Sequence, residues 1–537
     1  MPTLNWIGKE AVVNHHLQVP FRLLKDVPEL STGDPGSGNL IVQGDNLVAL
    51  KALLPYYAGQ VKCIYIDPPY NTGNEGWAYN DNVNSPVIRE WLGKTVGKGD
   101  ETLDRHDRWL CMMYPRLALL RQFLRQDGAI FISLDDNEIQ ALRYVMDELF
   151  GEQNFIATVI WQKMDGPKNT ARHLSEDHDY IVIYAKNAEV WRPKKLPRTE
   201  GMKARYKNPD NDPRGPWLLS DLAARNLYAQ GRYPITTKKG RVIEGPPAGS
   251  YWRVNREKFD ELERDGRIWW GKTGDNRPGI KRFLTEVQEG IVPQTLWHWK
   301  DAGSTRHAKQ ELSQLMAAVA SQDLFITPKP VQLIERILQI ATETGDLVLD
   351  SFAGSGTSGH AVLSLNKRDG GNRRFILVEV EPKIARELTV ERVRRVAQGY
   401  TNAKREQVEG VGGGFRYCEL GEPLFDEHGQ IKPSVRFADL ARHVYFTETG
   451  EPLPRERVPH SPKIGECRGV AIYLLFNGIL GDKTANGGNI LTRSVLAQLP
   501  KFDGQKVIYC AGCLLGRDRL QAERIIVRQT PYEIKVS

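Results

Sequence analysis

Four consecutive residues, Asp67-Pro68-Pro69-Tyr70, combine groups that suit chemistry on an aromatic amine. Two prolines fix two φ angles at about −65° and remove two N–H donors, so the turn is rigid and its carbonyl oxygens are free to accept hydrogen bonds. The Asp67 carboxylate and the Pro68 carbonyl could accept both hydrogens of an exocyclic NH2 group on a planar base, while the Tyr70 ring stacks on it. These two hydrogen bonds would make the amine nitrogen a better nucleophile toward a sulfonium methyl group. Taken alone, the tetrapeptide fits a turn at a strand end equally well.

A second segment has the glycine content of a nucleotide-binding turn. It reads Asp350-Ser351-Phe352-Ala353-Gly354-Ser355-Gly356-Thr357. Glycines let the backbone approach a ligand closely, and the N-terminus of a following helix favours a carboxylate. Glu379 closes the next predicted strand, where an acidic side chain can accept hydrogen bonds from ribose hydroxyls, as in Rossmann folds. The spacing is neither the dinucleotide G-x-G-x-x-G pattern nor a P-loop.

Both segments follow short apolar runs that predict buried strands, Val61–Ile66 before Asp67 and Leu347–Leu349 before Asp350. Further strands are predicted at 129–134 and 375–378. Helices are predicted at 46–54, 109–125, 138–149, 331–342 and around 360–365, with Asp135-Asp136-Asn137 as a possible cap of the third. Residues 71–107 are polar and rich in glycine and asparagine, which predicts a long loop. The alternation of strand and helix predicts an α/β domain with a mostly parallel sheet.

The α/β pattern breaks between residues 151 and 320. That segment contains 29 Lys and Arg against 21 Asp and Glu, whereas the net charge of the whole chain is +7. It also holds eight of the twelve tryptophans. Basic side chains pair with phosphates and aromatic rings stack on exposed bases, which favours nucleic-acid binding. A solvated basic surface over an aromatic core would have the same composition. His173 and His178, among acidic residues, are interpreted as part of a solvated loop.

The size and composition of the chain suggest more than one domain. A chain of 537 residues exceeds what one hydrophobic core usually supports. No apolar run approaches the roughly 20 residues that cross a bilayer, and no secretory signal is evident, so no membrane association is expected. Six cysteines fit a reducing compartment, and the cytoplasm is the expected location. Cys510 and Cys513 are interpreted as an incidental pair, and no metal site is predicted.

Taken together, these motifs resemble the amino-group DNA methyltransferases. Phe352-x-Gly354-x-Gly356 is similar to the S-adenosylmethionine loop of that family, and Asp67–Tyr70 to its catalytic motif. Thr327-Pro328-Lys329-Pro330 resembles the segment that precedes the loop and also contacts the cofactor. Gly44-Asp45-Asn46 resembles an upstream motif whose acid usually reaches the adenosyl part. The catalytic motif precedes the cofactor loop, which is the circularly permuted order of the β group.

The resemblance implies a Rossmann-like methyltransferase domain in two parts, residues 1–150 and 321–400. A DNA target-recognition region would be inserted at 151–320, and a small C-terminal module of unassigned role would follow at 401–537. The implied catalytic residues are Asp67, Pro68, Pro69 and Tyr70. The implied residues for binding S-adenosylmethionine are Asp45, Lys329, Asp350, Phe352, Ala353, Gly354, Ser355, Gly356, Thr357 and Glu379.

A longer run, Asp67–Asn74, together with Gly128–Phe131 and Asp135–Glu138, resembles the modification subunits of type III restriction–modification systems. Those subunits methylate adenine N6 in double-stranded DNA, on a base swung out of the duplex, and pair with a restriction helicase–nuclease. Enzymes of the β group are commonly homodimers. Cytosine N4 stays open as a target, because it also presents an NH2 group on a ring.

Two other classes of function are weaker alternatives. A module that only reads DNA for a helicase–nuclease would be expected to lack Asp67 or Gly354, and both are present. RNA and protein methyltransferases of related type often begin the tetrapeptide with Asn and place it after the cofactor loop, unlike this chain.

Overall fold

The computed structural model describes residues 4–72, 93, 105–287, 290–316, 327–453, 458, 460–476, 478–481 and 488–531. The chain divides into two compact units. The larger unit is formed by Met1–Lys194 and Gln294–Ser537, and the smaller unit by Lys195–Pro293. Among the described residues, no helix is both long and apolar enough to cross a membrane.

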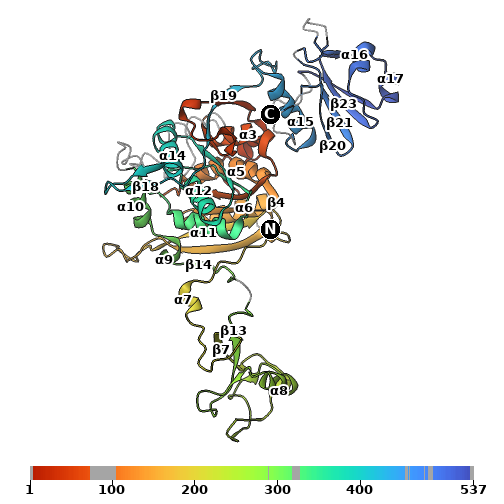
Figure 1. Cartoon of the computed structure of the whole chain (residues 1–537). Coiled ribbons are helices and arrows are strands. Elements are labelled where there is room, and N and C mark those ends of the chain that lie inside the picture. Colours follow the sequence, from red (N-terminus) through yellow and green to blue (C-terminus); the bar gives the residue numbers. More distant parts are fainter. Residues whose placement is uncertain are drawn as a thin grey trace. The chain divides into compact units, whose positions relative to one another are not determined.

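A ten-stranded mixed sheet forms the centre of the larger unit (Figure 1), in the order β1-β19-β2-β16-β15-β3-β4-β6-β5-β14. The strands are β1 (Arg22–Asp26), β2 (Leu40–Gln43), β3 (Val61–Ile66), β4 (Leu124–Leu134), β5 (Phe155–Gln162), β6 (His178–Ala185), β14 (Leu296–Trp297), β15 (Leu347–Asp350), β16 (Arg374–Glu379) and β19 (Arg416–Pro423). The run from β19 to β4 is parallel throughout. Parallel strands are buried on both faces, which explains why β3, β15 and β16 are nearly continuous apolar runs.

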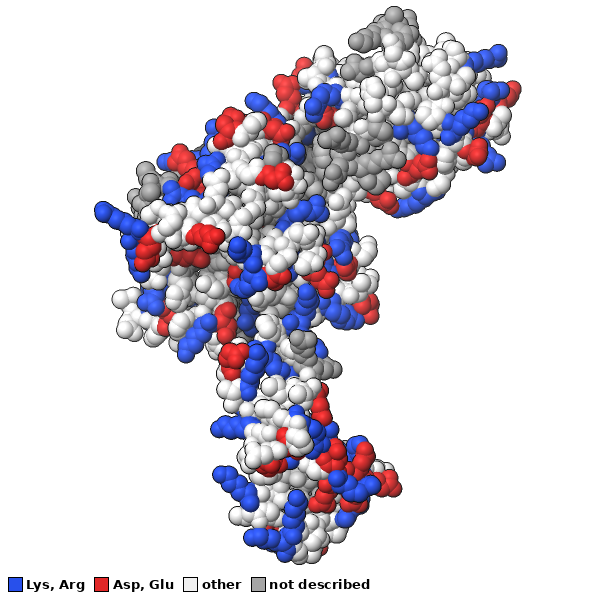
Figure 2. Space-filling model, in the orientation of Figure 1, with Lys and Arg blue, Asp and Glu red and all other residues white. Residues whose placement is uncertain are grey.

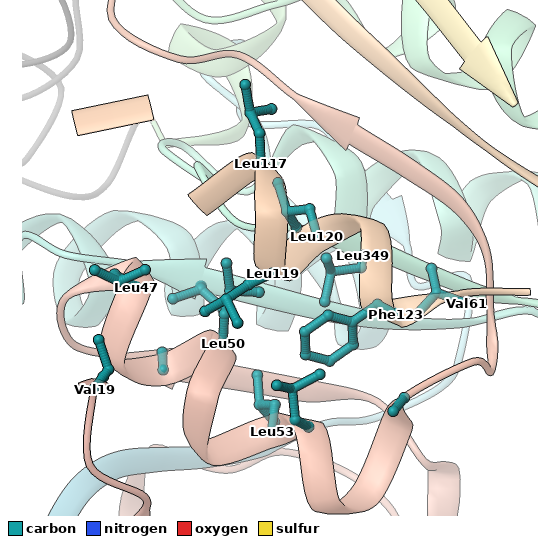
Figure 3. Packing of buried hydrophobic residues seen from close by; sticks show 14 of the residues in the cluster. Val19, Leu47, Leu50, Leu53, Val61, Leu117, Leu119, Leu120, Phe123 and Leu349 are labelled. Atoms are coloured by element: carbon teal, nitrogen blue, oxygen red, sulfur yellow. The ribbon is translucent and has the colours of Figure 1, made fainter. Parts of the chain in front are cut away.

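Helices pack on this sheet and carry the apolar core. The helices of the larger unit are α1 (Lys9–Val12), α2 (His15–Gln18), α3 (Asn46–Tyr57), α5 (Arg105–Phe123), α6 (Ile139–Phe150), α9 (Trp299–Ala302), α10 (Thr305–Leu315), α11 (Val331–Ala341), α12 (Thr357–Asp369), α13 (Pro382–Ile384), α14 (Val390–Gln398), α15 (Phe437–Thr449), α16 (Arg493–Gln498) and α17 (Arg517–Ala522). Figure 3 shows Leu50 and Leu53 of α3 beside Phe123 of α5, with Val61 and Leu349 of the sheet. All five side chains are fully buried, so α3, α5 and the strands share one core.

The predicted strands and helices of the α/β pattern are confirmed, with shifts at their ends. Helix α5 begins at Arg105, four residues before its predicted start, and β4 begins at Leu124, five residues before its predicted start. The predicted cap of α6 is wrong. Asp135 accepts hydrogen bonds from the N–H and the side-chain amide of Asn137, at 2.9 and 2.7 Å, and Glu138 precedes the helix without a side-chain cap. Most of the predicted loop at 71–107, residues 73–104, lies outside the described residues apart from residue 93.

The smaller unit consists of short strands and two helices around an aromatic core. Its strands are β7 (Trp217–Asp221), β8 (Ala223–Ala224), β9 (Ile235–Thr236), β10 (Val242–Ile243), β11 (Tyr251–Trp252), β12 (Ile268–Trp269) and β13 (Gly279–Phe283), and its helices are α7 (Glu200–Lys203) and α8 (Arg256–Arg264). Strands β12, β13 and β7 form an antiparallel sheet. Trp252 and Trp270 lie in the core with Phe259 of α8.

The segment predicted as an insertion, residues 151–320, has two structural parts. Strands β5, β6 and β14 extend the large sheet, whereas the compact smaller unit spans only 195–293. Six of the eight tryptophans of the segment are buried, which are Trp161, Trp191, Trp217, Trp252, Trp270 and Trp297. These rings therefore pack inside the protein, and of the six only Trp161 also lines the cavity beside Asp67.

The smaller unit accounts for the positive charge of the segment. Residues 195–293 contain 20 Lys and Arg against 13 Asp and Glu, an excess as large as the net charge of the whole chain. On the face that Figure 2 shows, the basic side chains are interspersed with acidic ones. The excess is thus spread over the surface in view and does not form a single basic stripe there.

Described residues after 400 contribute to four sheets. Two of these are two-stranded, formed by β17 (Gly399–Thr401) with β18 (Gln407–Glu409) and by β22 (Ile490–Leu491) with β24 (Gly512–Cys513). Strand β19 lies within the large sheet, parallel to β2 and antiparallel to β1. A second sheet has the order β20-β21-β23-β25, formed by β20 (Lys463–Cys467), β21 (Val470–Leu474), β23 (Gln505–Cys510) and β25 (Ile525–Gln529). Strands β21, β23 and β25 coincide with apolar runs of the sequence at 470–476, 506–511 and 524–528. Cys510 is buried in this sheet, and neither it nor Cys513 forms a disulfide.

Candidate active site

Two neighbouring parallel strands deliver the two predicted motifs to the same edge of the sheet. Strand β3 ends at Ile66, directly before Asp67, and its partner β15 ends at Asp350, the first residue of the glycine-rich turn. The next strand, β16, ends at Glu379. Strand β2, beside β16, ends shortly before Asp45. In open α/β sheets, ligands bind at this carboxyl-terminal edge.

The catalytic turn is anchored by hydrogen bonds to the helices around it. The indole nitrogen of Trp109 donates to the carbonyl oxygen of Pro69 at 2.7 Å. Asn71 adopts the left-handed conformation at φ 58°, which asparagine tolerates better than most residues. Its side-chain amide donates to the Arg105 carbonyl at 2.9 Å and to Glu138 Oε1 at 2.5 Å. By contrast, among the described residues no donor reaches the carbonyl of Pro68, which lines a cavity.

Asp67 forms an ion pair with Lys329, which comes from the Thr327–Pro330 segment. The Lys329 Nζ lies 2.6 Å from each carboxylate oxygen of Asp67, and both side chains are largely buried. The same ammonium lies 4.9 Å from the centre of the Tyr70 ring, in cation–π range. Burial raises the pKa of Asp67, and the Lys329 ammonium opposes that rise. Lys329 thus favours the ionised carboxylate in a place that water scarcely reaches.

Tyr70 is held as a neutral phenol. Burial and the nearby Asp67 carboxylate raise the pKa of Tyr70 well above its ordinary value. Its buried hydroxyl makes no well-aligned hydrogen bond with the described residues. The Tyr70 ring is placed by its contact with the Lys329 ammonium, 4.9 Å from the ring centre.

A cavity of about 290 Å³ lies against the catalytic turn. It is lined by Asp67, Pro68, Tyr70, Thr72, Asp135, Trp161, Lys163, Met164, Glu176, Asp179, Thr305, Thr327, Pro328 and Lys329. The lining from Trp161 to Asp179 was not predicted from the sequence. The interpretation of His178 as part of a solvated loop is wrong, because His178 begins β6. Asp179, the next residue, is 4% exposed and lies opposite Trp161 of β5. The signal that could have placed it is the apolar run from Tyr180 that follows it directly.

Buried carboxylates fix the shape of the glycine-rich turn. One oxygen of Glu379 accepts from the Gly354 N–H at 2.8 Å and the other from the Glu381 N–H at 2.9 Å. Asp350 accepts from the Phe352 N–H at 3.0 Å and from the Ser358 hydroxyl at 2.5 Å. Burial raises the pKa of Asp350 to about 7. Glu379 and Asp350, which were predicted to bind a ligand, therefore also fix the conformation of the turn.

The hydroxyls of the turn are fixed by a buried cation. Arg392 of α14 is fully buried and donates to the hydroxyl oxygens of Ser355, at 2.9 Å, and Thr357, at 2.8 Å. The Thr357 hydroxyl also donates to the Lys329 carbonyl at 3.3 Å. Lys329 thus contacts the catalytic turn through its side chain and the glycine-rich turn through its backbone.

Asp45 lies at the start of α3. It accepts from the Val48 N–H at 3.1 Å as a helix cap and pairs with Arg116 at 2.8 Å. The amide of Asn46, the next residue, donates to the Ser351 carbonyl of the glycine-rich turn at 3.3 Å. Asp45 is therefore attached to the same edge as Glu379 and the glycine-rich turn. The structure brings the predicted catalytic and ligand-binding residues together at one edge.

Comparisons with a family model and with individual proteins point to the same family. A family model described as DNA methylase matches residues 61–391. The chain is 35% identical over 387 residues to the type III restriction-modification enzyme StyLTI Mod subunit of Salmonella typhimurium, a match that covers 67% of this chain and 57% of that protein. It is 27% identical to the type II methyltransferase M.KpnI of Klebsiella pneumoniae, over 72% of this chain and 94% of that protein.

A solved structure with some likeness is the cytosine-N4-specific PvuII DNA methyltransferase. It is 12% identical, with a TM-score of 0.33, and the match covers 66% of this chain and 86% of that one. A similarity of this size supports no argument about substrate. The chain spans little more than half the length of the Salmonella relative, so the activity of that whole protein does not carry over as a finding.

Substituting Gly356 tests whether the turn depends on its glycine. Gly356 has φ 79°, and a Cβ there would lie 3.2 Å from Thr389 Cγ2 and from the Thr389 carbonyl oxygen. Gly370, at φ 68°, has open space around it and is the matched control. Gly370→Ala should lower the free energy of unfolding by about 1–2 kcal/mol from backbone strain alone, and Gly356→Ala by more. Urea unfolding measures both, and equal losses would show that crowding at Thr389 plays no part.

Proposed function

The chain belongs to the DNA methylase family, and on this premise we propose that it transfers a methyl group from S-adenosylmethionine to the N6 amino group of adenine in double-stranded DNA. The observation that carries the proposal is the cavity that Asp67, Pro68 and Tyr70 line together. Two hydrogen-bond acceptors can take the two hydrogens of an NH2 group, and one aromatic ring can stack on the planar base that carries it. Lys329, which lines the cavity, also accepts a hydrogen bond from Thr357 of the turn that is predicted to bind the cofactor.

The residues of the catalytic turn would act by holding the amine. The Asp67 carboxylate and the Pro68 carbonyl each accept one hydrogen of the NH2 group, which frees the nitrogen lone pair from the ring. An ionised carboxylate has about four acceptor positions, so Asp67 can hold Lys329 and the amine together. Pro69, whose carbonyl is engaged by Trp109, keeps the turn rigid. Transfer of the methyl group would break its bond to sulfur and form one to nitrogen. The nitrogen must then lose one proton, and Asp67 would receive it.

The glycine-rich turn and the acids beside it suit the cofactor. S-adenosylmethionine, when bound, supplies an electrophilic methyl group on a sulfonium. The backbone of Phe352, Ala353, Gly354 and Gly356 would lie against it, at a helix N-terminus that favours its carboxylate. A carboxylate has about four acceptor positions, so Glu379, which accepts from the Gly354 and Glu381 N–H groups, is proposed to accept from ribose hydroxyls as well. Asp45, Asp350, Ser355 and Thr357 complete the proposed set, and Lys329 joins it to Asp67.

The smaller unit is the proposed site of target recognition. Its excess of positive charge, 20 Lys and Arg against 13 Asp and Glu, would favour the phosphate backbone, and reading of base edges would supply the specificity. The target base would then swing out of the duplex into the cavity beside Asp67. The tryptophans of the smaller unit contribute to its folding, because most of them are buried.

Adenine is proposed over cytosine because the sequence around the catalytic turn resembles type III modification subunits. The Salmonella relative is named as such a subunit. Cytosine N4 is the second candidate, because it offers the same NH2 group to the same acceptors. We further propose that the chain is located in the cytoplasm and forms a homodimer. Its proposed partner is a restriction helicase–nuclease, for which the chain could also serve as the DNA-reading subunit.

Removing the Asp67 carboxylate should stop the reaction. Asp67→Ala is expected to lower the rate of methyl transfer by about a hundredfold or more, the scale on which a group that stabilises a transition state acts. Binding of S-adenosylmethionine, measured by calorimetry, should stay close to wild type. Because the change leaves Lys329 without its counter-ion, the double variant Asp67→Ala/Lys329→Met serves as a folding control. Methylation of DNA at the wild-type rate by the single variant would refute the assigned role.

The aromatic ring and the hydroxyl of Tyr70 can be separated. Tyr70→Ala should cost about 1–3 kcal/mol in base binding, because stacking is lost. Tyr70→Phe should cost far less, since the hydroxyl makes no well-aligned hydrogen bond with the described residues. Single-turnover methylation measures both losses. If the two variants lost the same amount, stacking would not be the contribution of this residue.

The ion pair with Lys329 should set the pH dependence. Burial raises the pKa of Asp67, and Lys329→Met removes the charge that opposes this rise. A higher pKa means that a higher pH is needed to ionise the carboxylate. The acid limb of kcat/KM against pH should therefore move upward by about 1–3 pH units, whereas Lys329→Arg should leave it near its wild-type position. An acid limb that Lys329→Met does not move would contradict the account.

A further inference from the structure

A second ion pair lines the cavity beside the catalytic turn. The Lys163 Nζ lies 2.6 Å from Asp179 Oδ1, and both residues belong to the cavity lining. The Asp179 side chain is 5% exposed and that of Lys163 is 23% exposed. The negative charge of Asp179 contributes to raising the pKa values of Asp67 and Tyr70, so this carboxylate acts on the catalytic turn through the cavity. The proposed catalytic motif includes neither Lys163 nor Asp179.

Lys163 is held firmly by its backbone. Its N–H donates to the Asp177 carbonyl at 2.9 Å, and its own carbonyl accepts from the Thr305 N–H at 3.0 Å. It directly follows β5, which ends at Gln162 and pairs with β6. The Lys163 side chain therefore starts from a fixed point, and Asp179 fixes its far end.

The charged side chains around the cavity leave Lys163 able to donate further hydrogen bonds. Four of the lining side chains are carboxylates, Asp67, Asp135, Glu176 and Asp179, and only two are cations. Lys329 is engaged by both oxygens of Asp67. An ammonium has three N–H donors, and within the described part of the chain only Asp179 accepts one from Lys163. The Trp161 indole N–H, which also belongs to the lining, donates to the Gly303 carbonyl at 3.0 Å.

A base in this cavity needs a donor as well as acceptors. If Asp67 and Pro68 take the two amino hydrogens of adenine, the ring nitrogens N1, N3 and N7 remain as acceptors. A buried acceptor without a donor is costly, and carboxylates cannot donate when ionised. A charged donor makes the stronger hydrogen bond, which favours an ammonium over the threonine hydroxyls of the lining.

We propose that Lys163, positioned by Asp179, reads the extruded base by donating a hydrogen bond to one of its ring nitrogens. This rests on the proposed function, because it assigns a further contact in the same cavity. Lys163 would then select bases that carry an acceptor at the right distance from the amino group, and Asp179 would be a positioning residue that acts through it.

Atomic substitution in the DNA tests the contact directly. Duplexes are prepared with adenine, 1-deazaadenine, 3-deazaadenine or 7-deazaadenine at the target, and single-turnover methylation is measured with wild type and with Lys163→Met. One analogue should slow the wild type by about tenfold to a hundredfold, the scale of a charged hydrogen bond. The same analogue should slow Lys163→Met no further, because the donor is already gone. Asp179→Asn should reduce the wild-type discrimination while retaining part of it.

Lys168→Met is the matched control. Lys168 is exposed in the same β5–β6 connection and does not line the cavity, so this variant should discriminate among the analogues as the wild type does. The proposal is overturned if the wild type methylates all three analogues as fast as adenine, or if Lys163→Met keeps the full wild-type discrimination. Failure of the proposed function looks different, since wild type would then methylate no adenine duplex at all.

Discussion

The parallel pairing of β2, β16, β15 and β3 is the constraint on which the site depends. These strands are neighbours in the sheet, although they come from two distant chain segments, residues 40–66 and 347–379. Because parallel strands end at the same edge, their last residues meet there whatever the distance along the chain. Asp67, Asp350 and Glu379 each occupy or directly follow such an end, and Asp45 follows the end of β2 by two residues. A shift in the register of β3 on β15 would move the catalytic turn away from the glycine-rich turn.

Buried charges are arranged in pairs along this edge. Asp67 is paired with Lys329, Asp179 with Lys163, and Asp45 with Arg116. For Asp67, burial favours the protonated form, and the Lys329 ammonium opposes this effect. Lys329 has the broadest role, because its side chain reaches the catalytic turn while its carbonyl accepts from Thr357 of the other turn. One segment thus connects the two halves of the proposed reaction.

Much of the fold could be predicted from the sequence, because buried parallel strands are short apolar runs with little ambiguity. The strand at 61–66 has the predicted limits, the strand at 347–350 is one residue longer at its end, and the strand at 374–379 is one residue longer at each end. The sequence could not show that β5, β6 and β14 join the large sheet, because strand pairing at that distance leaves no local pattern. For the same reason Lys163 and Asp179 were missed, since they enter the cavity only through that pairing. The role of the tryptophans could not be decided from the sequence, because aromatic residues are typical both of a folded core and of a surface that stacks on bases.

The central claim is that this edge of the sheet methylates an exocyclic amine. The most direct test incubates the purified chain with duplex DNA and S-adenosylmethionine that carries a labelled methyl group, then digests the DNA and identifies the labelled nucleoside. The account predicts label in N6-methyldeoxyadenosine. Label on a ring carbon, such as C5 of cytosine, or no label in DNA at all, would contradict it.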